Sequence, residues 1–532
     1  MPEMSPSQMT HPSTSDGDEP VTDVIDVMDP EILRSSEKDA TDDNREGAIL
    51  KLTKTLSRVG SRKLDNVDPS NEVKWDGVDD EENVRNFSNF RKWLITIWLT
   101  LATFQITSLS SAWGLASEPL RQEIGMSQEV SVLGISLYVL ALAIGPLLFA
   151  PLSEFYGRRP VYLFAYIGYF AFQFPTAFGH NTPTVIIPRF LAAFFASSFM
   201  ANVSGTISDL FDKDHITYPV AVFTAGPFIA PGAGPLIAGF IVEHVSWRWV
   251  FYVMIIWTFC MALGVVLMCP ETFGPVLLAK KAKRLRKKTG NQNLYAPFEV
   301  MDKSLVNTIK TNCSRPFMLL SLDPILLLLC LYSGFVLAVV YLFFVVFPIV
   351  FQEVYGFNYQ DVGMAFIGLI VGMASMMPLL PVIVQQRDKA IQKNGGVAEP
   401  EMRLPGMCAG SLLMPISLFW FAWTIYPSVH WICPIIASTL FGLGCNFTFS
   451  AVISYIVEAY PKFAASAVGA NVFVRCTMSA AFPLFGRQMF YGMGFHWATT
   501  LLALVAVLFM PSSFLLYRYG KTIRKRSKFA QN

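Results

Sequence analysis

Long apolar runs alternate with short polar segments over most of the chain. From about residue 93 onward, each run reaches the roughly 20 residues that an α-helix needs to cross a bilayer. We predict membrane-spanning helices at 93–113, 129–149, 160–179, 184–208, 218–241, 249–269, 325–350, 361–384, 406–426, 431–456, 464–486 and 497–517. A polar gap divides these twelve runs into six and six, which is typical of proteins built from a duplicated unit. We therefore expect an all-α membrane protein with two six-helix bundles.

Polar residues gather at the two ends and in the centre of the chain. Residues 1–88 are rich in Ser, Thr, Asp, Glu and Pro, lack an apolar N-terminal signal, and predict a disordered cytosolic tail. Within it, the basic island at 50–63 favours a membrane-surface segment, a phosphorylated segment or a solvated linker, and all three interpretations stay open. The rest is expected to form a bundle at 89–270, a cytosolic linker at 271–324, a bundle at 325–517 and a basic cytosolic tail at 518–532.

The distribution of Lys and Arg predicts the orientation. The linker from 280 to 315 and the segment after 518 are basic, and the short loop after the second span carries Arg158 and Arg159. Twelve spans place these three segments on one side, together with both termini, and basic loops mark the cytosolic side. No Asn-X-Ser/Thr triplet falls in a predicted external loop, which agrees with this orientation.

Composition and charge narrow the range of functions. Hydrophobic residues make up 53% of the chain and charged residues only 15%, against about 25% charged in soluble domains. The net charge is +2, and the basic residues adjoin apolar segments, so no nucleic-acid partner is expected. The eight cysteines and six histidines are scattered, which predicts no metal, no cofactor, no disulfide framework and no catalytic cluster. A channel would need a selectivity filter or rings of like residues, and the sequence offers neither.

The loop after the second span carries the first candidate mechanism. Glu154 precedes Arg158 by four residues, and Gly157 allows a tight turn where two helices meet the cytosol. Glu154 is expected to pair with nearby guanidinium groups or to cap a helix of the other half. We call Glu154, Arg158 and Arg159 the charged latch, which would hold one conformation and open in another. An ordinary basic turn after a membrane helix is the alternative.

Several polar side chains lie within predicted spans. Arg189 lies early in the fourth span, where an arginine must be paired, hydrated or extended to the outer surface, and extension to the surface is the simplest interpretation. Gln105, Gln173 and Asn446 are candidates for lining a substrate cavity. Glu458 and Arg475 flank one end of a helical hairpin and are expected to form a structural pair.

The fifth predicted span is unusually rich in glycine and proline. Such a helix is tolerated in a membrane where a neighbour packs closely, so we expect a helix contact or hinge. The residues concerned are Gly226, Pro227, Gly232, Gly234, Pro235 and Gly239. A phosphate-binding loop is not expected, because the similar Gly520-Lys521-Thr522 segment has Leu515 where the first glycine belongs.

From about Trp75 onward, these segments resemble the major facilitator superfamily, and within it the fungal drug:proton antiporters with twelve spans. The segment Ala150 to Arg159 is similar to the superfamily's loop motif, although Ala150 and Phe155 depart from it. Arg189-Phe-Leu resembles the fourth-span motif, in which the arginine is thought to assist proton transfer. The run from Gly226 to Gly239 is similar to the antiporter motif, the most specific of the three.

The resemblance implies a proton-coupled exporter of small organic toxins, in which two bundles rock around a central cavity. The segment beginning at Tyr341 resembles the seventh span and adds Tyr341 to the cavity candidates. The Trp75-Asp-Gly and Arg526 to Ala530 segments resemble the subgroup that exports azoles, benomyl, cycloheximide or caffeine. A polyamine or other organic cation is the alternative substrate. The expected partners are a small molecule, a proton and the bilayer, for a monomer in the plasma membrane, with vacuolar and endoplasmic reticulum membranes as alternatives.

Overall fold

The computed structural model describes residues 68–77, 80–212, 215–300, 305–461, 463–525, 527 and 529–530. The basic island at 50–63 lies outside these residues, as does all of the predicted tail before it. The described residues from Pro69 to Glu299 and from 305 onward belong to one compact unit.

The described residues contain twelve helices that are long and apolar enough to cross a membrane, as predicted. The first six are α3 (Asn89–Ile124), α4 (Gln128–Tyr156), α5 (Arg158–Phe178), α6 (Thr182–Leu210), α7 (Thr217–His244) and α8 (Arg248–Met268). The second six are α12 (Pro324–Tyr355), the run α13 (Tyr359–Ala365), α14 (Ile367–Ala374) and α15 (Met376–Lys393), then η3 with α16 (Pro400–Arg403, Leu404–Thr424), α17 (Ile432–Ala459), α18 (Ala464–Met493) and α19 (Phe495–Arg524).

Shorter helices lie before and between the two groups of six. They are η1 (Pro69–Asn71), η2 (Val84–Asn86), α9 (Gly274–Thr289), α10 (Pro297–Val300) and α11 (Leu305–Leu322). Among the described residues, β structure is limited to one isolated bridge between Glu72 and Tyr295. The protein is therefore all-α in the part that the structure describes.

Helix ends follow from local chemistry, as the connection between α3 and α4 illustrates. Gly125 ends α3 in the left-handed region at φ 72°, a conformation that glycine adopts without a Cβ clash. Two residues later the Ser127 side chain accepts a hydrogen bond from the Val130 backbone N–H and caps α4. Three residues thus reverse the chain at the membrane surface.

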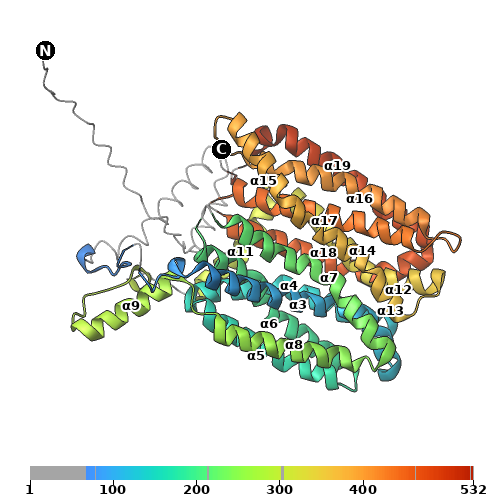
Figure 1. The fold of residues 1–532 in the computed structure, drawn as a ribbon, viewed down its shortest axis with the longest axis horizontal. Coiled ribbons are helices and arrows are strands. Elements are labelled where there is room, and N and C mark those ends of the chain that lie inside the picture. The colour runs from blue at the N-terminus through green and yellow to red at the C-terminus, as the bar shows by residue number, and fades with distance from the viewer. Residues whose placement is uncertain are drawn as a thin grey trace, which may run out of the picture. The chain divides into compact units, whose positions relative to one another are not determined.

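The two groups of six form two bundles with the same internal contacts (Figure 1). In the first bundle α3 packs on α7, α4 on α6, and α5 on both α6 and α8. The equivalent helices of the second bundle repeat every one of these contacts, namely α12 with α18, α14 with α17, and α16 with both α17 and α19. The main contacts between the bundles are also equivalent to each other, since α4 meets α18 and α7 meets α13 and α14. The bundles are thus related by an approximate two-fold axis, as expected for a duplicated unit.

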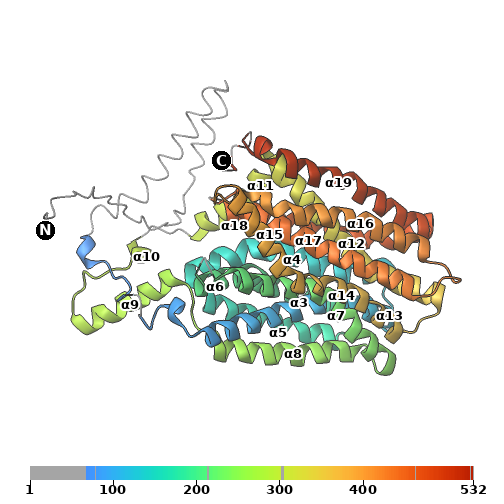
Figure 2. The same cartoon turned by 45° about the horizontal axis from the view of Figure 1, so that its top comes forward.

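One end of the bundles carries the segments that join them. At this end α4 and α8 end, α5 begins, and α9 and α11 lie beyond or beside the membrane helices (Figure 2). We call it the linker end and the opposite one the loop end.

Two predicted tail boundaries are wrong. Within the predicted tail of 1–88, Val73 donates a backbone hydrogen bond to Tyr295 at 2.9 Å, so the segment from 69 to 88 packs on the central linker. At the other end α19 continues to Arg524, past the predicted start of the basic tail at 518. Lys521 and Arg524 in these last turns pair with Glu399 and Glu401, which explains why basic residues extend the helix.

Candidate functional site

The glycine-rich helix α7 belongs to the first bundle and also contacts the second. A Cβ at Gly234 would overlap the Ser108 backbone of α3, within the first bundle. A Cβ at Gly239 would lie 2.5 Å from the Tyr359 carbonyl oxygen of α13, in the second bundle. Small residues allow backbones to approach this closely in a membrane protein. The predicted helix contact is therefore present, and it is two-sided.

The other motif residues of α7 follow the same division. A Cβ at Gly226 would lie 2.6 Å from the Thr100 side chain of α3, whereas one at Gly232 would lie 2.5 Å from Ile370 of α14. Pro227 and Pro235, together with Pro231, lie inside the helix. Each proline removes a backbone donor, so α7 has fewer internal hydrogen bonds than an ordinary helix of its length.

Three contacts join the bundles near their centre. The Ser110 hydroxyl of α3 and the Tyr341 hydroxyl of α12 are 3.0 Å apart, so Tyr341 lies at the interface of the bundles. Phe228 of α7 stacks on Phe449 of α17 with ring centroids 4.4 Å apart. The guanidinium of Arg475 lies near both rings, 5.5 Å from Phe228 and 5.4 Å from Phe449. These side chains form the central candidate site.

The expected pair between Glu458 and Arg475 does not form. Glu458 accepts from Arg387 and Arg403, each at 2.8 Å, at the linker end of α17. Arg475 lies deeper in α18 and faces the other bundle. The two residues are near in the sequence across a hairpin, but the tilt and rotation of α17 and α18 separate their side chains, which a linear pattern does not encode.

Arg189 is buried and does not reach the membrane surface. Only 2% of it is exposed, and its fork donates to the backbone carbonyls of Gly134, Leu109 and Ser110 at 2.7, 3.0 and 3.3 Å. The guanidinium carbon also lies 4.5 Å from the Trp113 ring. Surface exposure, the simpler of the two sequence interpretations, is therefore wrong. Arg189 ties α6 to α3 and α4.

Gln105 and Gln173 belong to a polar cluster inside the first bundle. Both side-chain amides donate to the Thr258 hydroxyl, at 3.0 and 2.8 Å, and the Tyr169 hydroxyl donates to Gln105 at 3.1 Å. The cluster joins α3, α5 and α8, away from the contacts between the bundles. Asn446 likewise donates to a backbone carbonyl of its own bundle, at 2.7 Å. Among the residues that the structure describes, Tyr341 is the only one of the four cavity candidates with a hydrogen bond to the opposite bundle.

The charged latch lies at the linker end, where α4 meets α5. Arg158 is buried, and its guanidinium donates to the Ser153 hydroxyl at 2.6 Å and pairs with Asp209 of α6 at 3.5 Å. Arg159 is exposed and donates to a backbone carbonyl of α8 at 3.1 Å. Glu154 is half-buried in the last turns of α4, which extends to Tyr156. Its role as a gating carboxylate stays a prediction.

A second carboxylate, Glu271, holds the start of α5. It accepts the backbone N–H groups of Arg158 and Arg159, at 2.8 and 3.3 Å, and those of the two residues after itself, both at 3.0 Å. A carboxylate at a helix N-terminus satisfies free backbone donors and offsets the helix dipole. Gly157 at φ 98° makes room for it, since a Cβ there would overlap the Glu271 carboxylate.

Neither Asp209 nor Glu271 was predicted as a site residue. Asp209 follows the predicted fourth span by one residue, and Glu271 lies in a Pro-Glu-Thr sequence directly after the sixth. The sequence did contain a signal for both residues. Each is a lone acidic residue directly after an apolar run, on the side of the membrane where the basic loops lie. The pairing itself required knowing that α6 and α8 end beside the loop between α4 and α5.

The N-terminal segment packs on the linker helix α9 through ion pairs. Lys281 lies between Asp76 at 2.8 Å and Asp80 at 2.7 Å, and Arg284 pairs with Glu82. The hydrogen bond from Lys281 lowers the pKa of Asp80 from 3.8 to about 2. The residues Asp76, Asp80 and Glu82 of the N-terminal segment and the helix α9 thus form a polar module, which covers the linker end of the first bundle.

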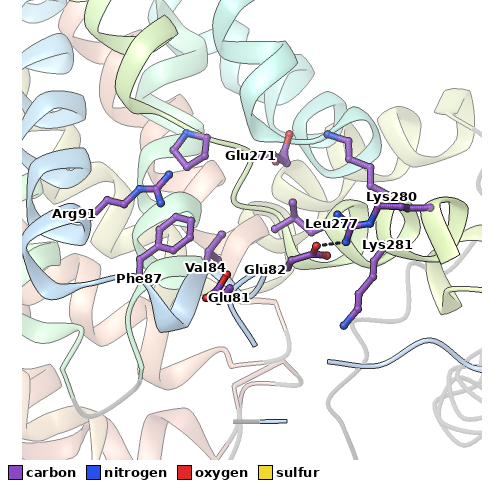
Figure 3. A pocket seen from close by; sticks show the side chains of 11 residues that line it. Glu81, Glu82, Val84, Phe87, Arg91, Glu271, Leu277, Lys280 and Lys281 are labelled. Atoms are coloured by element: carbon purple, nitrogen blue, oxygen red, sulfur yellow. Dashed lines mark hydrogen bonds and ion pairs between the residues drawn. The ribbon is translucent and has the colours of Figure 1, made fainter. Parts of the chain in front are cut away.

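A cavity of about 470 Å³ opens beside this module (Figure 3). Its lining includes Arg91 and Lys280 as well as Glu81 and Glu271, so charges of both signs surround it. It lies at the linker end, against the first turn of α3, and does not qualify as the central substrate site. Among the described residues, no group of three or more His, Cys, Asp or Glu side chains could hold a metal ion.

Comparison with known proteins gives a consistent result. A family profile described as "Major Facilitator Superfamily" matches residues 98–483. A "Probable drug/proton antiporter" of Saccharomyces cerevisiae is 41% identical over 89% of this chain and 93% of its own. An efflux pump of Aspergillus terreus is 44% identical over 73% and 83%, and a multidrug transporter of Aspergillus fumigatus 38% identical over 86% and 76%.

Solved structures with the same fold include two transporters. A proton:xylose symporter matches with a TM-score of 0.59 and 15% identity, covering 81% of this chain and 96% of its own. A peptide transporter matches with a TM-score of 0.58 and 13% identity, covering 83% and 96%. These likenesses concern the arrangement of the helices.

Proposed function

Because the chain belongs to the Major Facilitator Superfamily, we propose that it is a secondary transporter that exports small organic molecules in exchange for protons. The observation that carries the proposal is the two-fold contact between the bundles, made by α4 with α18 and by α7 with α13 and α14. Such an interface allows two rigid bundles to rock about a central site. Relatives named as drug/proton antiporters and efflux pumps support export as the direction.

Alternating access follows from the two-sided packing of α7. Gly239 contacts the Tyr359 backbone and Gly232 contacts the Ile370 side chain, and both contacts are lost without breaking an ion pair when the bundles separate. Gly226 and Gly234 keep α7 on α3, so the helix moves with the first bundle. The substrate would bind near Tyr341 and Arg475, where side chains of both bundles meet.

Proton coupling would use the carboxylates at the linker end. Protonation of the Asp209 carboxylate would weaken its pair with Arg158, whose guanidinium also holds Ser153 of α4. Loosening these contacts would change the packing of α4 and α6 and shift the balance between the two conformations. Glu154 and the fork of Arg189 are the further groups that we assign to this coupling.

We place both termini and the linker end on the cytosolic side, because Lys and Arg are concentrated there. A monomer in the plasma membrane suits an exporter of toxins, with vacuolar and endoplasmic reticulum membranes as alternatives. Within a superfamily of transporters, no enzymatic activity and no nucleic-acid partner are expected. A polyamine substrate is disfavoured by the buried cation Arg475 at the centre, because like charges repel.

The test is transport by the purified full-length chain in proteoliposomes. Rhodamine 6G, which is a cation, and fluorescein, which is an anion, are added to the medium in separate assays, and accumulation of either dye supports the proposal. An inward-acidic pH gradient is imposed across vesicles of known protein orientation. We expect uphill dye accumulation that collapses with a protonophore. Dye flux that follows only its own gradient, with or without the protonophore, would instead indicate a channel or leak.

A further inference from the structure

Arg475 is a buried cation whose hydrogen-bonding groups are largely unused. Only 6% of the residue is exposed, and it lies toward the middle of a membrane-spanning helix. Its Nε and Nη1 atoms have no hydrogen-bond acceptor in the part of the chain that the structure describes. No carboxylate of that part lies within ion-pair distance of it. Burying an arginine within a membrane-spanning helix costs free energy unless its positive charge is neutralised by a partner.

The other buried arginines show how this protein normally satisfies such a group. Arg158 pairs with Asp209, Arg189 donates to three backbone carbonyls, and Arg524 donates to Glu401 at 3.1 Å. Of these four buried arginines among the described residues, only Arg475 leaves buried guanidinium nitrogens without an acceptor. The exception coincides with the place where the two bundles meet.

The surroundings of Arg475 are aromatic and come from both bundles. Phe228 belongs to the first bundle and Phe449 to the second, and their stacked rings face the guanidinium at about equal distances. The helices that carry these three residues lie together in the centre of the molecule (Figure 1). A flat apolar ring system could stack on either ring when the bundles part, while its charged group meets the cation.

We propose that Arg475 binds the anionic group of the exported substrate, and that the substrate class is small aromatic carboxylates. A carboxylate matches the planar fork of arginine with two parallel hydrogen bonds, which a neutral or cationic molecule cannot provide. Phe228 and Phe449 hold the aromatic part. The proposal rests on the proposed function as an exporter, because it names what that exporter carries.

The experiment measures binding with a pair of ligands that differ in charge and little in shape. Equilibrium dialysis of the detergent-purified full chain compares radiolabelled 1-naphthoate with radiolabelled 1-naphthamide. We expect naphthoate to bind about tenfold more tightly or better, since hydrogen bonds to charged groups are strong when buried. Arg475→Met should bring the two affinities to within about twofold of each other while naphthamide still binds. Arg475→Lys should retain part of the preference, because it keeps the charge and loses the fork.

Two controls make the result decisive. Arg387→Met removes an arginine of the linker end that pairs with Glu458, and it should leave the preference for naphthoate unchanged. If Arg475→Met does not yield a folded protein by size exclusion, Arg475→Gln replaces it as the neutral variant. Equal binding of the two ligands by the wild type, or an unchanged preference in the neutral variant, would overturn the proposal and leave Arg475 as a packing residue.

Binding is measured without a proton gradient and without transport. Failure of proton-driven dye accumulation would therefore count against the exporter and not against the anion site. Conversely, a chain that exports rhodamine 6G but shows no preference for naphthoate would keep the proposed function and lose this substrate class.

Discussion

Arg189 depends on the shape of its side chain as well as its charge. Its fork reaches carbonyls on two other helices, Gly134 of α4 and both Leu109 and Ser110 of α3, and a lysine ammonium cannot span them. We expect Arg189→Lys to retain only part of the proton-driven export rate, with a shifted pH optimum. Arg189→Ala should abolish export, because each lost charged hydrogen bond costs about 1.5–3 kcal/mol.

The measurement for Arg189 is the initial rate of export in proteoliposomes from pH 5 to 8, normalised to the protein inserted. The protein must still reach its membrane in both variants. Export by Arg189→Lys at the wild-type rate over the whole pH range would show that the fork has no special role.

Two carboxylates at the linker end are expected to have different functions. Glu271 caps a helix and stabilises the fold, whereas Glu154 is the candidate for gating. Glu271 accepts four backbone N–H groups, so Glu271→Gln would turn an amide N–H toward donors and cost about 1–3 kcal/mol for each one left unpaired. We expect a lower melting temperature and lower export. Glu154→Gln, as the gating hypothesis requires, should keep the melting temperature and lower export several-fold.

Thermal unfolding by tryptophan fluorescence, together with export rates, distinguishes the two variants. Normal rate, expression and pH dependence in Glu154→Gln would make Glu154 a surface charge. An unchanged melting temperature in Glu271→Gln would show that the start of α5 does not need this cap.

At the scale of elements, α7 connects the bundles through glycines of two kinds. Gly234→Ala places a methyl group against the Ser108 backbone within the first bundle, and overpacking of this type costs about 1–3 kcal/mol. Gly239→Ala places one against the Tyr359 backbone of the opposite bundle. We expect the first variant to lose stability and the second to fold normally but shift toward the conformation in which α7 and α13 are apart.

Melting temperature reports the first effect, and labelling of Tyr359→Cys with a membrane-impermeant thiol reagent reports the second. In the Gly239→Ala background this label should react faster than in the parent. If both alanine variants changed melting temperature alike and labelling not at all, α7 would be a packing element without a role in the conformational change.

At the scale of the whole molecule, we expect a functional boundary within the N-terminal segment, close to the residues that pair with α9. Removing residues 1–67 leaves the ion pairs of Asp80 and Glu82 with α9 intact, whereas removing 1–86 deletes them. We expect the shorter deletion to export normally and the longer one to lose several-fold in rate or expression. Equal export activity of both truncated proteins would show that the module on α9 is dispensable. Loss of export after removal of residues 1–67 alone would show that the tail takes part in transport.

The ion pair of Asp80 has a defined pH dependence. Its folded-state pKa of about 2 is below the ordinary 3.8, so the pair stabilises the docked segment from about pH 4 up to the alkaline pH at which Lys281 loses its proton. On the acid side, the contribution is lost as the pH falls from 4 toward 2. Limited proteolysis of the segment should therefore be equal at pH 5 and pH 7 in the wild type and faster at both in Asp80→Asn.

Orientation is tested by the accessibility of the linker. Lys283 is exposed on α9, with no charge pairing among the described residues, and Lys283→Cys should react with an impermeant thiol reagent only after cells are permeabilised. Labelling in intact cells would place the linker end outside and reverse the proposed direction of transport.

The amino-acid sequence is sufficient to establish the membrane class, the twelve helices and their division into six and six. These follow from the length of the apolar runs and from the rule that a backbone in lipid must satisfy its own hydrogen bonds. It also located the close-packed helix α7, because a membrane helix tolerates a dense run of glycine and proline only where a neighbouring helix packs closely against it. Both conclusions depend on residues that are near one another in the chain.

Which polar groups meet became evident only from the packing of the helices. Glu458 pairs with Arg387 and not with Arg475, and Asp209 and Glu271 surround a loop far from them in sequence. The physical reason is that side-chain partners in a helical bundle depend on the tilt and rotation of helices relative to each other. Hydropathy places a helix in the membrane but leaves its rotation free, so the unsatisfied cation at Arg475 became visible only once the two bundles were assembled.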